Sequence, residues 1–399
     1  MNLYREAFLN IKKFSGAFWI VIIATLMSRA GNMALVFLVL YSTQYMGFTL
    51  AQAASAFAAL SGSMILGGIL AGNLIDYFGA VRMMIGSVIM NGIVLLIIPL
   101  THHYYTIIFM CLLWGFFYGI YQPASQTLVS YLSAARLHKL TFSVYRLAIN
   151  LGMSIGPAIG GYLATHSFPA IFITNGIANI LAGLILIVGF IGSKWMMYRP
   201  AFEQKKIFTI KWLRYDAALR LFLIGMIPIS MVFFQHESTL AVYLKQDLNF
   251  PLSFYGWLFT INTLMIVFFE LALNVATIHW PYRVNFMMGS VFITAGFAGV
   301  YFATNMQHIV LLTVIWTIGE MILYPSASSY IADIAPEERR GSYMSLFSTF
   351  SNLGLLIGPW AGAVVMQQIS NSALWIVCGL WGAISIILFY FVSEPKKKE

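Results

Sequence analysis

The segment Asn150–Pro157 reads Asn-Leu-Gly-Met-Ser-Ile-Gly-Pro, and Asn352–Pro359 repeats it nearly intact as Asn-Leu-Gly-Leu-Leu-Ile-Gly-Pro. The offset between the two segments is 202 positions, about half of the 399-residue chain. Two further pairs of residues share this offset: Trp114 with Trp316, and Pro123 with Pro325. Because one offset holds at three separate places, the sequence predicts two copies of one structural unit, and such internal symmetry is typical of membrane transporters.

The composition of the chain indicates that most of its surface faces lipid. Hydrophobic residues make up 60% of the chain and charged residues 9%, whereas soluble globular proteins carry about 25% charged residues. Apolar runs of the roughly 20 residues that span a bilayer recur from end to end. We therefore predict an all-α integral membrane protein with twelve transmembrane helices. Their approximate ranges are 16–42, 50–74, 80–100, 104–131, 141–164, 168–194, 217–243, 253–279, 282–304, 307–332, 341–367 and 371–393.

The longest polar stretch of the chain lies at its centre, between the sixth and seventh predicted helices. We interpret residues 194–216 as a basic cytoplasmic linker. It separates two predicted six-helix bundles, which comprise residues 1–193 and 217–399. The other predicted loops are too short to form a domain.

The basic residues lie mostly on one side of the predicted membrane. Of the 22 Lys and Arg residues, Lys245 falls in a predicted outer loop, and Arg29 and Arg146 fall well inside predicted spans, which leaves 19 in predicted cytoplasmic segments or at the span ends that border them. The positive-inside rule then places both termini in the cytoplasm. Because the net charge of +9 gathers at this face, it favours contact with anionic lipid rather than with nucleic acid.

The loop between the second and third predicted helices contains Gly72, Asp76, Gly79 and Arg82. Glycines at both ends allow a tight reversal at the membrane face, and Asp76 is placed to pair with a helix dipole or a cation. The spacing resembles the signature loop of the major facilitator superfamily, although Tyr77 stands where a basic residue is usual. In that family the loop latches the two halves in the outward-open state, so the resemblance implies a conformational latch.

The fifth predicted helix carries a glycine-rich pattern formed by Gly152, Gly156, Pro157, Gly160 and Gly161. Glycines at four-residue spacing let another helix approach closely, and proline removes a backbone hydrogen bond and loosens the helix. The pattern resembles the antiporter motif of the same superfamily, which acts as a hinge in alternating access. The eleventh predicted helix repeats it in part, at Gly354, Gly358, Pro359 and Gly362.

Further segments resemble the twelve-helix bacterial drug:proton antiporter branch of this superfamily. They are Ser28–Met33 in the first helix, Thr317–Pro325 in the tenth and Ala335–Met344 after it. Together the resemblances cover nearly the whole chain and imply a major facilitator fold with two pseudo-symmetric bundles. The chain departs from the branch at Gly115, where these proteins often carry an arginine that relays protons.

Four ionisable side chains of the second predicted bundle are candidates for proton coupling: His236, Glu237, Glu270 and Glu320. A charge near the bilayer centre costs about 2.5–3.5 kcal/mol even on a lenient scale, so such residues usually face a cavity. A carboxyl in a low-dielectric cavity has a raised pKa and can exchange protons near neutral pH. If its protonated and ionised states prefer different conformations of the transporter, proton flow is coupled to conformational change. The alternative is a structural carboxylate paired with Arg29 or a backbone group, and for His236 we favour a polar cavity or interface residue over a proton relay.

Two arginines fall within predicted spans and have open interpretations. Arg29 either binds an anionic group of a substrate or forms an ion pair with an acid. For Arg146, near the cytoplasmic end of the fifth helix, we favour a side chain that extends to the membrane surface. The candidate cavity residues, for each of which packing is the alternative, are Arg29, Tyr118, Gln122, Gln235, Asn262, Trp316 and Tyr324.

These features predict a proton-coupled secondary transporter that exports small amphipathic or hydrophobic compounds in exchange for protons. The alternative is a proton-symport importer of a peptide, siderophore or other metabolite. Scattered histidines and the lack of a phosphate-binding loop argue against an enzyme, a metal site or an ATP-driven pump. We expect no cofactor, the proton gradient as the energy source, a small-molecule substrate, protons and lipid as partners, function as a monomer, and a bacterial inner (plasma) membrane as the location.

Overall fold

The chain is helical along nearly all of the part that the structure describes. The computed structural model describes residues 11, 14–134, 137–197, 216–237 and 239–395. Residues 198–215, which make up most of the predicted linker 194–216, lie outside the described residues. The helices are α2 (Gly16–Ala30), α3 (Ala34–Leu40), α4 (Leu50–Phe78), α5 (Ala80–Ile97), α6 (Tyr104–Tyr131), α7 (His138–His166), α8 (Phe168–Phe190), α9 (Lys194–Met197), α10 (Ala217–Phe233), α11 (Thr239–Gln246), α12 (Leu252–Ala276), α13 (Tyr282–Ala298), α14 (Met306–Ile334), α15 (Arg340–Gln368) and α16 (Ala373–Tyr390).

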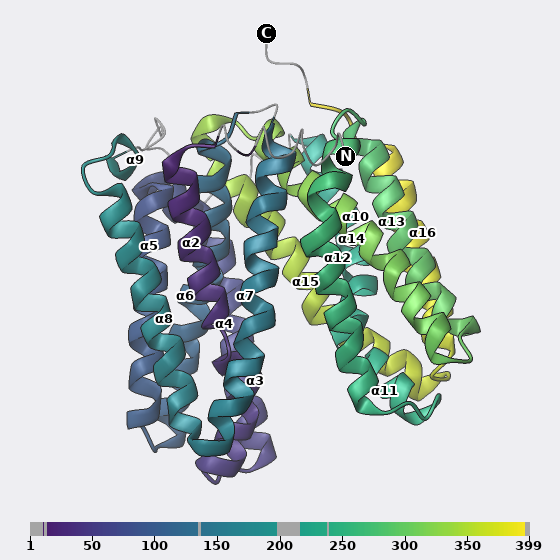
Figure 1. The fold of residues 1–399 in the computed structure, drawn as a ribbon, viewed down its shortest axis with the longest axis horizontal. Coiled ribbons are helices and arrows are strands. Elements are labelled where there is room, and N and C mark those ends of the chain that lie inside the picture. Colours follow the sequence, from purple (N-terminus) through teal and green to yellow (C-terminus); the bar gives the residue numbers. More distant parts are fainter. Residues whose placement is uncertain (1–10, 12–13, 135–136, 198–215, 238, 396–399) are drawn as a thin grey trace.

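The helices form two bundles that lean against each other (Figure 1). Helices α2 to α8 pack among themselves, as do α10 to α16. The bundles touch at one end of the molecule, where α4 and α6 meet α15 and where α7 meets α12 and α14. They diverge toward the other end, where α3 and α11 lie. We call these the closed end and the open end.

Ten helices in the described part of the chain are long and apolar enough to cross a membrane. Helix α2 is shorter, with 15 residues, and α7 is not among the ten. Helical segments nevertheless lie over each of the twelve predicted ranges. The count of twelve spans therefore stays a prediction.

The first helix of each bundle is interrupted, where the sequence predicted continuous helices over 16–42 and 217–243. In the first bundle the α-helix ends at Ala30 and resumes at Ala34. In the second, a 3-10 segment at Phe234–Glu237 separates α10 from α11. One cause is visible there, because the side chain of Gln235 donates to the carbonyl of Met231 at 2.9 Å and so competes with the helical ladder. The two halves therefore share the interruption of their first helix as well as the sequence repeat.

The glycine pattern brings α7 against α2 and, equivalently, α15 against α10. A Cβ added at Gly152 would lie 2.5 Å from the Cβ of Arg29. A Cβ added at Gly354, the partner in the repeat, would lie 2.2 Å from the Cβ of Ser230. Real Cβ atoms do not approach so closely, so both contacts depend on glycine. In contrast, a Cβ at Gly161 would meet nothing within 4 Å.

Adding one methyl group at Gly152 is expected to destabilise the protein. Gly152→Ala forces α7 away from Arg29 and Ala30, and such overpacking typically costs about 1–3 kcal/mol. Gly161→Ala is the matched control, because it adds the same atom to the same helix in open space. Thermal unfolding of the two purified variants checks this, and equal midpoints would contradict the packing argument.

Candidate functional site

A buried group of charges joins the two bundles near the closed end. Arg146 of α7 donates from Nε to Oε1 of Glu270 at 3.1 Å and from Nη2 to Oε1 of Glu320 at 3.0 Å. The side chains of Glu270 and Glu320 are 0% and 7% exposed, and that of Arg146 is 16% exposed. Both acids belong to the second bundle, on α12 and α14. We call Arg146, Glu270 and Glu320 the charge cluster.

Polar and aromatic neighbours hold the charge cluster in place. Asn262 of α12 donates to Oε2 of Glu320 at 2.8 Å and to the hydroxyl of Thr317 at 3.1 Å. The guanidinium of Arg146 also lies over the ring of Tyr324, 5.2 Å from its centroid. The structure thus brings together four of the predicted residues: Glu270, Glu320, Asn262 and Tyr324.

The charge cluster contains more acid than base. Two carboxylates share one guanidinium, and Oε2 of Glu270 has no hydrogen-bond partner. With both acids ionised, the buried group carries one negative charge in excess, which burial disfavours. One proton would make it neutral, so the geometry suits a group that gains and loses a proton.

Arg146 occupies a different position from the one we favoured. From the sequence we favoured a side chain that extends to the membrane surface, but Arg146 lies between the bundles and binds both acids. The second bundle has no Lys or Arg in the interior of its predicted spans to balance Glu270 and Glu320, since Arg220 and Arg283 lie at span ends. That imbalance was the available signal for Arg146.

The predicted latch bridges the two bundles at the closed end. Asp76, at the end of α4, accepts hydrogen bonds from the backbone N–H groups of Gly341 and Ser342 at 2.8 and 3.1 Å, and from the Ser342 hydroxyl. A carboxylate at the first turn of α15 also interacts favourably with the helix dipole. Gly72 lets α15 approach, because a Cβ there would lie 2.7 Å from the Cα of Ser342. Gly79 joins α4 to α5 with a φ of 91°, which favours glycine, and Arg82 lies in the first turn of α5.

Asp76→Asn is expected to open the closed end more often. The amide replaces one acceptor oxygen with a donor that faces other donors, which costs about 1–3 kcal/mol. The reporter is a cysteine at Ser348, which is 3% exposed on α15 between the bundles, in a background where the buried Cys111 and Cys378 are alanine. We expect maleimide labelling to accelerate roughly tenfold or more.

The control for this experiment is Tyr77→Phe, which changes the exposed neighbour of Asp76. Its labelling rate should match that of the parent. Equal rates for Asp76→Asn and the parent would show that the contact with α15 does not hold the end closed.

Lys139 and His138 form two more contacts between the bundles at the closed end, which no sequence pattern predicted. Lys139, at the start of α7, donates from Nζ to the carbonyl of Thr277 at 3.1 Å and to Oδ1 of Asn285 at 2.9 Å. Thr277 caps the C-terminus of α12, where a cation is favoured by the helix dipole. His138 contacts Asp333, with Nδ1 2.6 Å from Oδ1.

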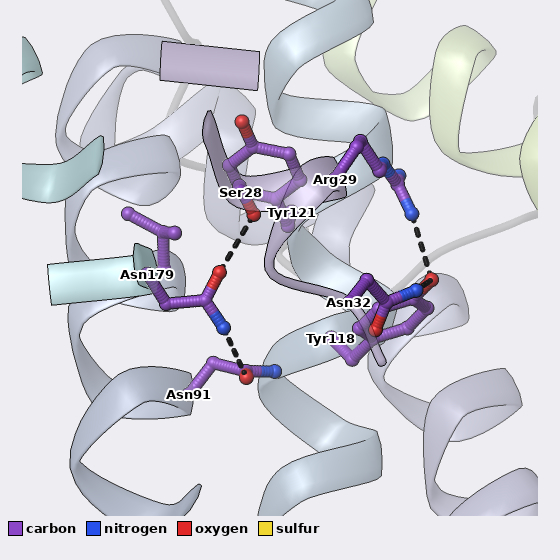
Figure 2. A pocket seen from close by; sticks show the side chains of 8 residues that line it. Ser28, Arg29, Asn32, Asn91, Tyr118, Tyr121 and Asn179 are labelled. Atoms are coloured by element: carbon purple, nitrogen blue, oxygen red, sulfur yellow. Dashed lines mark hydrogen bonds between the residues drawn. The ribbon is translucent and has the colours of Figure 1, made fainter. Parts of the chain in front are cut away.

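A second polar site lies wholly within the first bundle (Figure 2). Nη1 of Arg29 donates to the Tyr118 hydroxyl at 2.7 Å, and Asn32 donates to the same hydroxyl at 3.1 Å. Gln122 lies one turn further along the same helix, α6, and is half-buried. The pocket around Arg29 is lined by Ser28, Arg29, Asn32, Val88, Asn91, Tyr118, Tyr121 and Asn179. We call it the Arg29 pocket.

The remaining predicted residues lie in the second bundle, away from the charge cluster. His236 stacks among aromatic rings, with its centroid 5.4 Å from that of Trp316, and both line an apolar pocket. Glu237 is 43% exposed and lies 3.8 Å from His236. Gln235 binds the carbonyls of Met231 and Gly358 and accepts from Thr239, so its polar atoms serve the fold. Among the described residues, no group of three His, Cys, Asp or Glu is placed to hold a metal ion.

Comparison with known proteins identifies the class. A family model described as Major Facilitator Superfamily matches residues 20–243 and 222–399. The chain therefore belongs to the major facilitator superfamily. It is an integral, multi-pass membrane transporter for small molecules and not an enzyme.

Individual relatives are distant but cover nearly the full chain. The chain is 26% identical over 368 residues to the MFS-type transporter YqjV of Bacillus subtilis (strain 168), covering 88% of this chain and 86% of YqjV. It is 23% identical over 344 residues to the multidrug resistance protein MdtH of Aeromonas hydrophila subsp. hydrophila, covering 82% and 83%.

Solved structures share the fold at lower identity. The crystal structure of a bacterial homologue of the iron transporter ferroportin, in an outward-facing state, superposes with a TM-score of 0.79 at 15% identity and covers 94% of this chain and 99% of that one. The proton:xylose symporter XylE superposes with a TM-score of 0.70 at 13% identity, covering 95% and 96%. These likenesses establish the fold.

Proposed function

We propose that this transporter is a proton-coupled exporter, which moves small amphipathic or hydrophobic compounds outward in exchange for protons. The observation that carries the proposal is the charge cluster. It joins the bundles through an ion pair whose strength depends on a proton, because a protonated carboxyl loses most of its attraction to a guanidinium. A proton there would shift the balance between conformations, which is what coupling requires.

The same proposal orients the molecule in the membrane. We place the closed end in the cytoplasm, with twelve spans and both termini on that side. The latch and the basic residues Arg339 and Arg340 lie at this end, in agreement with the positive-inside rule. The form described is then open to the outside. The proposed location is the inner membrane of a bacterium, and the proposed functional unit is the monomer.

The proposed cycle follows from this orientation. A proton from the open end neutralises the excess charge of the charge cluster and weakens its hold on Arg146. The closed end then separates, the substrate enters from the cytoplasm, and the proton leaves to the cytoplasm. Reforming the cluster closes that end again and returns the site to the outside, as alternating access requires.

Export is favoured over import by two observations. Gly152 and Gly160 of the glycine pattern of α7 pack on the break in the first helix, at Arg29 and Met33, where a hinge would act. Relatives named multidrug resistance protein match most of the chain.

The test is proton movement in reconstituted vesicles. A strain that lacks other exporters is first screened with anionic, neutral and cationic amphipathic compounds. A compound to which the chain confers resistance is then added to vesicles that hold a pH-sensitive dye. Antiport predicts that protons and the compound cross the membrane in opposite directions. Outward flux of the compound without inward proton flux contradicts antiport, and movement of both in one direction supports the importer.

A further inference from the structure

Arg29 is a buried cation without a carboxylate partner. It lies on α2, and the residue is 6% exposed. Its contacts are the Tyr118 hydroxyl and the faces of Tyr118 and Tyr121, whose centroids lie 5.4 and 5.8 Å from Cζ. None of the ion pairs among the described residues includes it. A buried charge within a membrane protein is costly and usually marks a functional site.

The first bundle contains almost no acidic residue that could serve as a counter-ion for Arg29. Between Glu6 and Glu203, the only acidic residue of the chain is Asp76. Asp76 lies at the end of α4, where it is bound by the first turn of α15. The first bundle therefore contains a membrane-embedded cation and no free acid to neutralise it.

The acids of the second bundle have other partners. The carboxylates of the charge cluster bind Arg146, and Glu237 is half-exposed beside His236. The ion pair that the sequence left open for Arg29 is thus not formed in this conformation. The negative charge that would balance Arg29 has to come from outside the described chain.

Arg29 and Tyr118 each have a hydrogen-bond donor left over in the pocket. Its Nε–H is buried and has no hydrogen-bond partner. The Tyr118 oxygen accepts from both Arg29 and Asn32, which uses its two lone pairs and leaves its O–H to donate. A guanidinium and a hydroxyl that both donate into one pocket match the acceptor oxygens of an anion.

The pocket is also built to hold these donors still. Ser28 donates to Asn179 at 2.7 Å, and Asn179 donates to Asn91 at 2.9 Å, which ties α2, α8 and α5 together (Figure 2). On the other side of α2, Gly152 brings α7 against the Cβ of Arg29. Arg29 therefore stands on a fixed frame, and a preorganised site binds a ligand at lower entropic cost.

We propose that the Arg29 pocket binds the anionic group of the transported solute, a carboxylate, sulfonate or phosphate attached to an apolar body. The proposal rests on the proposed function, because it names the class of compound that the transporter carries. Arg29 neutralises the head group, and Tyr118 donates a hydrogen bond to it. An arginine suits this task because its planar fork binds oxyanions at two points.

The test compares two probes that share one apolar body and differ in the head group, an anionic carboxylate or a neutral amide. The purified full chain is titrated with 2-naphthoate and with the neutral 2-naphthamide, and the thermal midpoint and the dissociation constant are measured. We expect 2-naphthoate to bind at least about tenfold more tightly, the effect of one charge-assisted hydrogen bond. Equal binding of the two probes, or equal stabilisation by inorganic sulfate, would overturn the proposal.

Variants connect the binding to Arg29. Arg29→Met should abolish the preference for 2-naphthoate, and Tyr118→Phe should weaken it by a smaller factor. The unliganded Arg29→Met protein should be as stable as the parent, since a buried charge that lacks a partner is replaced by an apolar chain. Lys245→Met is the matched control, because it removes one positive charge from an exposed site on α11.

The outcomes separate this inference from the proposed function. If Arg29→Met binds 2-naphthoate as the parent does, the pocket assignment is wrong, whatever the vesicles show about protons. If Arg29→Met instead lowers the free energy of unfolding of the unliganded protein by as much as it lowers the free energy of binding, Arg29 has a structural role. The assignment of the pocket is then also wrong. If the anion binds through Arg29 but its transport moves no protons, the anion site stands and proton coupling fails.

Discussion

Replacing Glu320 with glutamine is expected to abolish transport driven by a pH gradient while leaving exchange of substrate across the membrane intact. Glutamine keeps an oxygen that can accept from Arg146 and stays neutral, so Arg146 and Glu270 balance and no excess negative charge is left for a proton to neutralise. The bundles can still rock, but the gradient no longer drives them. Gradient-driven uptake and counterflow exchange in vesicles, measured side by side, distinguish the two effects.

Glu270→Gln should show the same separation, because Glu270 shares the guanidinium and is fully buried. The control is Glu338→Gln, which makes the same change at an exposed residue of the closed end. Gradient-driven transport that persists in both Glu320→Gln and Glu270→Gln would reject the charge cluster as the coupling site. Loss of exchange as well would indicate a structural role instead.

The sequence predicted the fold because the signals for it are local and repeated. Apolar runs, a 202-residue offset and a shared glycine pattern each recur in both halves. The position of Asp76 was predictable for the same reason, since it lies at the end of an apolar run and precedes a tight turn. Its partners on α15 lie 265 and 266 positions away, and no pattern in the loop itself points to Gly341 or Ser342.

Pairing across the two bundles could not be predicted in the same way. Arg146 lies 124 positions from Glu270 and 174 from Glu320, so neither periodicity nor spacing connects them. Charge balance was the one usable signal. It required treating the halves as complementary, whereas the repeat suggests that they are alike. Glu320 occupies the place that Tyr118 holds in the first half. Glu320, which binds Arg146, and Tyr118, which binds Arg29, are therefore equivalent positions with different side-chain chemistry.

This division gives each half a separate task. The first half carries the two arginines that lie well inside predicted spans, and the second carries the acids that bind one of them. Arg146 thus joins the halves, whereas Arg29 remains inside its own half without a counter-ion. The break in the first helix lies beside both Arg29 and the glycine pattern, so a ligand on Arg29 would touch the element that a hinge uses.

Arg146→Met is expected to destabilise the closed end strongly. Removing one partner of a buried ion pair costs about 3–5 kcal/mol, because the acids remain buried without a cation. Labelling of the Ser348 cysteine reporter should therefore accelerate by roughly a hundredfold or more. The effect should shrink as the pH falls, because protons then neutralise Glu270 and Glu320 in place of Arg146.

Two further variants test the cause of that opening. Arg283→Met removes an exposed arginine from α13 and should label at the parental rate. Adding Glu270→Gln and Glu320→Gln to Arg146→Met removes the unpaired charges, so labelling should slow again toward that of the parent. If the triple variant labels as fast as Arg146→Met alone, the guanidinium closes this end through packing on Tyr324 rather than through its charge. The coupling role proposed for the acids would then lose its physical basis.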